Sequence, residues 1–472
     1  MAPGSVIQEY EHPQPSNTAT LTVDEKVRQE AIRSQITRPA GYTVSFHANP
    51  EVEKVHFGPN HPMKPWRMTL TNKIVLSYGM HHAMDVYCPP PAPREDLKIF
   101  HDPNYLEFLS KIVPPDEVGT APSAQALEFG MGDDCPIFDG LFEYCSLYAG
   151  SSLDAARALV SGRSDIAINW SGGLHHAKKK AASGFCYIND IVLAILHLLL
   201  YHPRVLYIDI DVHHGDGVEQ AFHSTDRVMT LSFHKYNRTE FFPGTGGLDE
   251  TGPKNNSNPG AHHSLNVPLN DGIDDESYTS LFRDIVQACH DTYRPSAIVI
   301  QCGADSLGGD RLGCFNLNIK AHGACVAFAK SLNLPLLVLG GGGYTARNVA
   351  RLWAYETAVC IGAQDTIHPA LPEHTPFLEH FPERTLFPDL GKVTRYENKN
   401  PPEYLEEIRA AIAEQLRYLQ GAPGVQMQYV PAGWDKRREE EEARLKEERE
   451  ARGIGRRKEE AGRGRQGELF AS

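Results

Sequence analysis

Two carboxylates and a histidine occupy alternate positions in one stretch of the chain, Val205 to Gly217. The stretch begins as an apolar run typical of a buried parallel strand, and then places Asp209, Asp211 and His213 at i, i+2 and i+4. In a strand, such side chains point to one face, with neighbours about 6.5 Å apart. Because an unpaired buried carboxylate is costly, a bound cation with oxygen and nitrogen ligands is one explanation. The alternative is a buried Asp–His hydrogen-bond network that only fixes the loop.

A catalytic zinc site requires three protein ligands and one open position for water. Asp211 and His213 provide two ligands. Asp305 is the candidate for the third, because it follows the apolar stretch Ala297 to Cys302 and is flanked by small residues. The alternative role for Asp305 is a helix N-cap. A zinc ion at this place lowers the pKa of bound water to about 7 and polarises a carbonyl group.

The adjacent residues His175 and His176 follow a pair of glycines, and either imidazole could serve as a general base. A buried histidine in that role usually needs a carboxylate on its other nitrogen. Asp209 and Asp216 are the two acids of the 205–217 stretch that remain unassigned, so there are two partners for two histidines. A histidine pair by itself is more often structural or exposed.

Two further features could belong to the same site. Gly340 to Gly343 precede Tyr344, and either they cradle a phosphate or they let the tyrosine hydroxyl donate to a developing oxyanion. The phosphate-loop signature is absent, because no Lys-Ser/Thr follows the glycines. Phe185 and Phe242 are loop aromatics that either pack in the core or line a narrow channel for an aliphatic chain.

The elements that must position these residues alternate between strand and helix. Short apolar strands are predicted at 165–170, 205–210, 228–233, 297–302 and 335–339, with helices at 183–200, 274–293, 319–332 and 346–361. This alternation predicts an α/β fold with one parallel sheet flanked by helices. Ligands of such sheets bind beyond the carboxyl ends of the strands, where all the polar residues above are found.

Composition restricts the class of protein. The formal net charge is −14, which argues against direct binding to nucleic acid and is compatible with a basic substrate. The nine cysteines include no C-x-x-C pair, which predicts free thiols in a reducing compartment. No apolar run reaches the roughly 18 residues of a membrane span, so no membrane association is expected.

Four segments together resemble the zinc-dependent class I histone deacetylases: Asn169 to Lys178, Ile208 to Gly217, Gln301 to Leu307 and Gly341 to Thr345. They follow the order and spacing of that family, and the similarity extends from about Thr43 to Pro431. The branch that works in nuclear corepressor complexes is the most similar, and a fungal source is expected. The resemblance implies the arginase–deacetylase fold and hydrolysis of N-acetyl-lysine in histones and other proteins. It also implies a role in transcription and chromatin regulation, in the nucleus and secondarily in the cytoplasm.

The resemblance also assigns roles to individual residues. His176 matches the general base, His175 its electrostatic partner, and Tyr344 the oxyanion donor. The remaining matches are Asp209 and Asp216 behind the histidines, the zinc ligands Asp211, His213 and Asp305, the acetyl-lysine tunnel residues Gly184, Phe185 and Phe242, and the rim carboxylate Asp134. Structural potassium matches Asp209, Asp211, His213, Ser232 and Phe233 at one site and Phe222, Thr225 and Val228 at a second. An inositol phosphate that bridges to a corepressor subunit matches Lys64, Arg311 and Arg347.

Composition at the two ends of the chain and the resemblance between them predict the layout of the chain. We expect a disordered arm at 1–41 with a short helix near 24–36, a catalytic domain at 42–375, an extension packed on it at 376–431 and a charged tail at 432–472. The sequence departs from the family at Gly247, at His262-His263 where an aromatic pair is usual, and in a longer loop from Tyr236 to Phe242. These departures concern the wall of the second potassium site and the rim of the tunnel.

Two other classes of protein are compatible with parts of the pattern. A binuclear ureohydrolase on a similar sheet would need additional bridging carboxylates, which neither Asp211 to His214 nor Asp305 to Leu307 supplies. A corepressor scaffold without activity would not need the complete set of ligands, base and tyrosine.

Overall fold

The structure, a computed structural model, describes residues 21–114, 123–255, 257–393 and 396–419 and positions 440, 443, 444 and 447. Its centre is an eight-stranded sheet in the order β2-β1-β3-β8-β7-β4-β5-β6, in which every pairing is parallel. The strands are β1 Val44–His47, β2 Asp85–Tyr87, β3 Ile166–Asn169, β4 Val205–Asp209, β5 Val228–Lys235, β6 Ser264–Leu269, β7 Ala297–Gln301 and β8 Leu336–Leu339. The predicted parallel α/β fold is therefore confirmed.

The five strands predicted from sequence are β3, β4, β5, β7 and β8, and the other three were missed. β1 and β2 are short, and β2 forms one edge of the sheet. β6 forms the opposite edge and contains Pro268, a residue that argues against a strand in most sequence patterns. A proline has no N–H for the ladder and is tolerated at an edge, which explains both the location of β6 and why it was missed.

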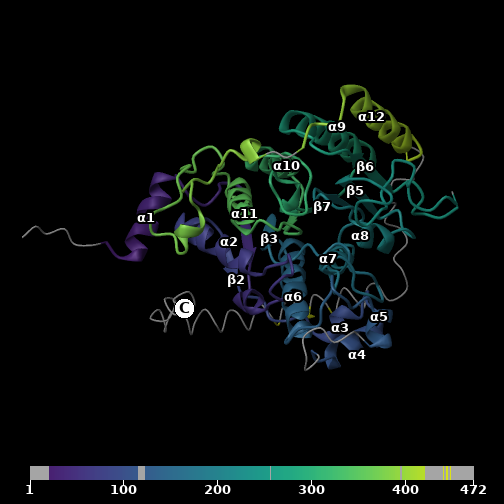
Figure 1. Cartoon of the computed structure of the whole chain (residues 1–472), viewed down its shortest axis with the longest axis horizontal. Helices are drawn as coiled ribbons and strands as arrows, with labels where there is room; N and C mark the ends of the chain where they lie inside the picture. Colours follow the sequence, from purple (N-terminus) through teal and green to yellow (C-terminus); the bar gives the residue numbers. More distant parts are fainter. Residues whose placement is uncertain are drawn as a thin grey trace, which may run out of the picture.

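Helices cover both faces of the sheet (Figure 1). Along β4, Leu206 and Ile208 face a core shared with α2, α9, α10 and α11, while Val205 and Tyr207 face a core shared with α6, α7 and α8. This alternation is the period of two expected of a strand that is buried on both sides. The longer helices are α1 Val23–Arg33, α2 Trp66–Ser77, α4 Pro103–Lys111, α6 Leu141–Val160, α7 Asp190–Leu198, α9 Asp275–Tyr293, α10 Ile319–Ser331, α11 Ala346–Cys360 and α12 Pro402–Arg417. The short ones are α3 Arg94–Leu97, α5 Ala124–Glu128, α8 Asp216–Ala221 and the 3-10 turns η1 Pro50–Lys54, η2 Met80–Ala83, η3 Ala304–Ser306, η4 Leu378–His380 and η5 Leu390–Val393.

The helix predicted at 183–200 begins later than expected. Asn189 is its N-cap, and the side chain of Asn189 accepts a hydrogen bond from the Val192 N–H at 3.0 Å. Residues 183–186 instead form a tight turn with an isolated bridge between Ser183 and Cys186. The turn, rather than a helix, is what carries Gly184 and Phe185.

Four central strands, β3, β8, β7 and β4, end at the same level, and the neighbouring β5 continues past it to Lys235. In register across the sheet lie Asn169, Leu339, Gln301, Asp209 and Ser232, from β3, β8, β7, β4 and β5. The loops that carry the predicted site residues therefore all start at the carboxyl ends of the strands, although these loops are far apart in sequence.

Segments at both ends of the described chain pack on this body. α1 lies within the predicted arm, close to the expected short helix, and buries Glu30 and Ala31, so this part of the arm is ordered. Within the predicted extension, Tyr404 of α12 donates to the Pro268 carbonyl of β6 at 2.7 Å. Residues 1–20 of the predicted arm and most of the predicted charged tail at 432–472 lie outside the described residues. Among the described helices, none is long and apolar enough to cross a membrane.

Candidate active site

Asp211, His213 and Asp305 converge beyond the ends of β4 and β7. Each offers one ligand atom, all of these atoms lie within 4.8 Å of one another, and all three residues are buried. Asp305 lies in η3, so it is not the N-cap of a long helix. Its Oδ1 accepts a hydrogen bond from the Val212 N–H at 2.9 Å, which ties the two loops together.

Asp211 and His213 point to one place, but not because they share a strand face as the sequence predicted. β4 ends at Asp209, so Asp211 and His213 lie in a loop and not on a strand face. The Asp211 N–H donates to Asp209 Oδ1 at 3.2 Å, and the His213 N–H donates to Asp211 Oδ1 at 3.0 Å. Two successive turns closed by aspartate side chains thus replace the strand ladder.

The donor set fits a zinc ion. Two carboxylates and one imidazole are ligands that zinc accepts, and they leave a position open. Two glycines make the room: a Cβ on Gly303 would lie 2.0 Å from Asp211 Oδ2, and one on Gly342 would lie 2.0 Å from Asp305 Oδ2. Burial and then the negative charge of the nearby Asp211 raise the pKa of Asp305 to about 7. A divalent cation would offset that charge.

His175 and His176 are each held by one of the carboxylates expected to pair with a histidine. His175 Nδ1 lies 2.8 Å from Asp209 Oδ2, and His176 Nδ1 lies 2.8 Å from Asp216 Oδ1. Because a carboxylate only accepts, each Nδ1 carries a hydrogen, and Nε2 is the other ring nitrogen of each imidazole. Lys178 Nζ donates to the second oxygen of Asp216 at 2.5 Å.

The two imidazoles differ in protonation. For His175, Asp209 and Asp211 outweigh burial and raise the pKa to about 9. For His176, burial and then the positive charge of His175 lower the pKa to about 3. His176 is therefore neutral at physiological pH and able to accept a proton, whereas His175 is a cation.

Tyr344 stands at the end of the glycine-rich loop, which two residues missed by the sequence reasoning hold in place. Asp310 accepts from the N–H groups of Tyr344 at 2.8 Å and Thr345 at 3.1 Å. Buried Arg67 donates to the carbonyls of Gly343 at 2.7 Å and Gly341 at 2.6 Å. Nothing local in the sequence pairs Arg67 or Asp310 with this loop. Burial and then Asp305 raise the pKa of Tyr344, so its hydroxyl remains a donor.

Aromatic side chains surround the entrance. Phe185 packs edge-on against Tyr344, with ring centroids 5.6 Å apart, and Phe242 packs edge-on against His176 at 4.9 Å. Gly184 packs against His176 and Phe242. A Cβ at this position would lie 2.5 Å from the His176 ring and 2.9 Å from the Phe242 ring. Phe242 is 42% exposed and so marks the outer end. Phe241, which the sequence reasoning did not single out, stacks on the His213 ring at 5.1 Å.

The remaining predicted residues lie farther from this centre. Asp134 is exposed, and its carbonyl is 3.2 Å from His61 Nε2. Ser232 lies beside Asp209 in the sheet, next to Phe233, and the loop of Phe222 and Thr225 precedes Val228 at the start of β5. Lys64 Nζ donates to the carbonyls of Gly58 and Pro59 at 2.8 Å. Arg311 and Arg347 are exposed and flank the contact between Asp310 and Thr345.

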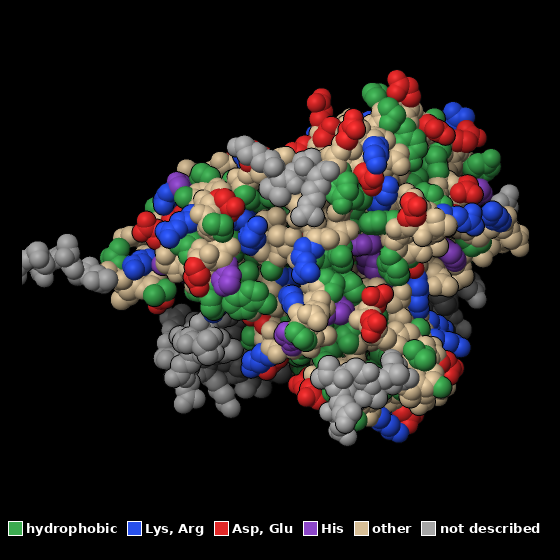
Figure 2. Space-filling model, viewed as in Figure 1, with side chains coloured by type: hydrophobic (Ala, Val, Ile, Leu, Met, Phe, Trp, Pro, Cys, Tyr) green, Lys and Arg blue, Asp and Glu red, His purple; other side chains and the backbone are tan. Residues whose placement is uncertain are grey.

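On the face that Figure 2 shows, Lys and Arg side chains are interspersed with Asp and Glu side chains.

Comparison with known proteins identifies the family of the chain. The model of the histone deacetylase domain matches residues 61–360. The chain is 54% identical over 389 residues to histone deacetylase B of Dictyostelium discoideum, covering 82% of this chain and 90% of that protein. It is 53% identical over 390 residues to histone deacetylase 9 of Arabidopsis thaliana, covering 82% and 88%. The chain therefore belongs to the histone deacetylase family of hydrolases.

Proposed function

We propose that the chain is a zinc-dependent deacetylase that hydrolyses N-acetyl-lysine side chains, chiefly of histones. One observation carries the proposal: a buried Asp-His-Asp set able to hold one metal lies beside a neutral histidine and a protonated tyrosine. Asp211, His213 and Asp305 would hold zinc. When bound, zinc supplies a polarised acetyl carbonyl and a water activated near neutral pH.

The protein's own residues perform the proton transfers. His176, held through Nδ1 by Asp216, takes a proton from the attacking water on Nε2. Tyr344 donates a hydrogen bond to the oxyanion of the tetrahedral intermediate. The imidazolium of His176 then delivers its proton to the departing lysine amine. His175, held by Asp209, places a fixed positive charge beside the developing negative charge.

The aromatic entrance selects the substrate side chain. Phe185 and Phe242 would enclose the four methylene groups of the lysine, and Gly184 leaves the width for them. Asp134, exposed in the loop that His61 contacts, is suited to hold the substrate backbone at the rim. The formal net charge of −14 favours the basic tails of histones.

The remaining roles follow the resemblance to class I enzymes. Asp209, Asp211, His213, Ser232 and Phe233 would hold one potassium ion, and Phe222, Thr225 and Val228 a second. Lys64, Arg311 and Arg347 would bind an inositol phosphate and through it a corepressor subunit, in the nucleus. A catalytic domain at 42–375, an extension at 376–431 and a charged tail at 432–472 complete the proposed layout.

The test is a deacetylation assay on acetylated histone peptides, with and without a chelator, combined with metal analysis of the purified chain. We expect one zinc per chain and activity that the chelator abolishes and zinc restores. Two tightly bound transition-metal ions per chain would instead indicate a binuclear hydrolase. Within the described ranges only the one Asp-His-Asp group has the geometry of a metal site.

A further inference from the structure

A buried polar pair lies behind the Asp-His-Asp set and belongs to no role assigned so far. His322 of α10 and Glu356 of α11 are both completely buried, and His322 Nδ1 lies 2.6 Å from Glu356 Oε1. Within the described part of the chain, Glu356 Oε2 has no hydrogen-bond partner. The neighbouring thiols of Cys302 and Cys325 stay protonated, because burial and then Glu356 raise their pKa values.

Stability does not account for such a pair. The desolvation of a buried ion pair consumes most of its attraction, and apolar residues of similar volume are often equally stable. We therefore look for the role of His322 and Glu356 in their other contacts. The second ring nitrogen of His322, Nε2, lies 3.0 Å from the carbonyl oxygen of Gly303.

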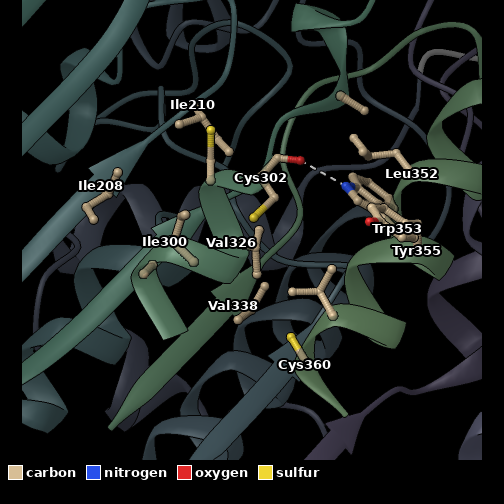
Figure 3. Packing of buried hydrophobic residues seen from close by; sticks show 14 of the residues in the cluster. Ile208, Ile210, Ile300, Cys302, Val326, Val338, Leu352, Trp353, Tyr355 and Cys360 are labelled. Carbon is tan, nitrogen blue, oxygen red and sulfur yellow. Dashed lines mark hydrogen bonds between the residues drawn. The ribbon is translucent and has the colours of Figure 1, made fainter. Parts of the chain in front are cut away.

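Gly303 is the point at which β7 turns toward Asp305, two residues further on. Its N–H donates to Gln301 Oε1 at 2.8 Å, and its α-carbon abuts the Asp211 carboxylate so closely that no side chain fits. The preceding carbonyl, of Cys302, accepts from the Trp353 indole at 2.8 Å, as Figure 3 shows. Two consecutive carbonyls at the turn are thus held from α10 and α11.

Glu356 keeps Nε2 of His322 able to donate. A carbonyl oxygen and a carboxylate both only accept, so Nε2 must carry a hydrogen to bind Gly303 and Nδ1 must carry one to bind Glu356. His322 with both hydrogens is an imidazolium. The negative charge of Glu356 stabilises this doubly protonated ring and so keeps Nε2 a donor to Gly303.

We propose that His322 and Glu356 are positioning residues, which hold the Gly303 carbonyl and thereby orient Asp305 for the metal. The inference rests on the proposed zinc site. Outer partners of this kind typically contribute about 10–100-fold to metal affinity or activity.

The experiment compares His322→Gln with His322→Asn, in the full chain loaded with cobalt(II) as a spectroscopic probe. The amide of glutamine reaches about where Nε2 lies and can still donate to Gly303, whereas that of asparagine ends near Nδ1. We expect release of cobalt to EDTA to be about 10–100-fold faster in His322→Asn than in the parent, with an altered visible spectrum and a fall in kcat that exceeds any change in KM. His322→Gln should restore most of the parent's behaviour.

A double variant, His322→Leu/Glu356→Leu, leaves no orphan charge, and we expect it to fold and to release cobalt as fast as His322→Asn does. The matched control is Thr357→Val, which removes the buried 3.0 Å bond from Trp170 one residue along α11 and should lower the melting temperature without changing cobalt release. Parent-like release and spectra in both His322→Asn and the double variant would overturn the proposal. If the parent itself binds no metal, the proposed function fails instead.

Discussion

Buried acids at the centre of the protein differ in behaviour because their neighbours differ. Asp216 is held by His176 and Lys178, which outweigh burial and lower its pKa, so it stays a carboxylate behind the base. Asp305 has another carboxylate beside it, and its pKa is raised. Aspartate thus provides a permanently ionised carboxylate at Asp216 and, at Asp305, a carboxyl group that a bound cation would keep ionised.

Tyr344→Phe tests the oxyanion donor. Loss of the hydroxyl should reduce kcat by about 10²–10³-fold and change KM little, because the bond forms only in the transition state. The measurement is steady-state deacetylation of an acetyl-lysine peptide. Tyr278→Phe is the control, since it removes a buried hydroxyl that has no hydrogen-bond partner within the described residues. Equal kcat in both variants would remove Tyr344 from the mechanism.

At the scale of elements, the site is built from turns and glycine segments rather than from regular structure. β4 and β7 end at Asp209 and Gln301, and the ligands follow in tight turns beyond them. Gly303 and Gly342 allow backbone to approach the carboxylates of Asp211 and Asp305. The strands fix where the turns begin, and the absence of side chains at the two glycines leaves space for an ion.

Gly342→Ala should abolish metal binding, because the new Cβ would lie 2.0 Å from Asp305 Oδ2 and 2.8 Å from Asp211 Oδ2. We expect zinc content near zero by metal analysis, with the far-ultraviolet circular dichroism of the parent. Gly132→Ala is a suitable comparison, since a Cβ there meets nothing within 4 Å. A Gly342→Ala protein that retains a full zinc ion would contradict this account of the ligand geometry.

α8 is fixed to the sheet by a buried acid, which makes stability depend on pH. Burial alone would raise the pKa of Glu219, but His214, His223 and Asn266 outweigh burial and lower it below the usual 4.5. Glu219 Oε2 lies 3.0 Å from His214 Nε2 and accepts from Asn266 Nδ2 at 2.9 Å. A lowered folded-state pKa stabilises the protein above the unfolded value, and this contribution is lost as the pH falls through the folded value.

Glu219→Gln should therefore destabilise the protein by about 1–3 kcal/mol near pH 7. The deficit should shrink as the pH falls below about 4.5, because glutamine does not titrate. Urea unfolding of both proteins across this range measures it. Glu406→Gln, whose side chain is 74% exposed in the parent, should differ little from the parent at every pH. A Glu219→Gln deficit that is constant with pH would show that the ionised carboxylate is not responsible.

At the scale of the whole molecule, the strand order brings loops that are distant in sequence together at the site. β4 and β7 are neighbours in the sheet although paired positions such as Asp209 and Gln301 are far apart in sequence. The metal ligands come from the loops after these two strands, and the glycine loop with Tyr344 comes from β8 on the other side of β7. A bound ion would therefore join three segments that are distant in sequence.

Zinc should for this reason stabilise the folded chain as a whole. A ligand that binds only the native state adds about 2.7 kcal/mol when its free concentration is 100 times Kd. We expect the melting temperature of the parent, followed by calorimetry, to fall on treatment with a chelator and to recover with zinc. The Gly342→Ala protein should show a much smaller shift, and an equal shift in both would place the stabilising ion elsewhere.

Local sequence determined the chemistry of this protein. The residue types and spacings in 169–178, 208–217, 301–307 and 341–345 predicted the histidine pair, the candidate ligands and the tyrosine. Alternation of apolar strands and helices predicted the parallel sheet, because that periodicity follows directly from burial on both faces.

Only the tertiary structure decided how these residues meet. It placed Asp211 and His213 in turns beyond β4, since aspartate side chains there outcompete the strand ladder for backbone N–H groups. It brought Arg67 and Asp310 to the glycine loop, and His322 with Glu356 to Gly303. Edge strands β2 and β6 also escaped prediction. Contacts between residues far apart in sequence leave no periodic signal in either partner, so they appear only when the chain is folded.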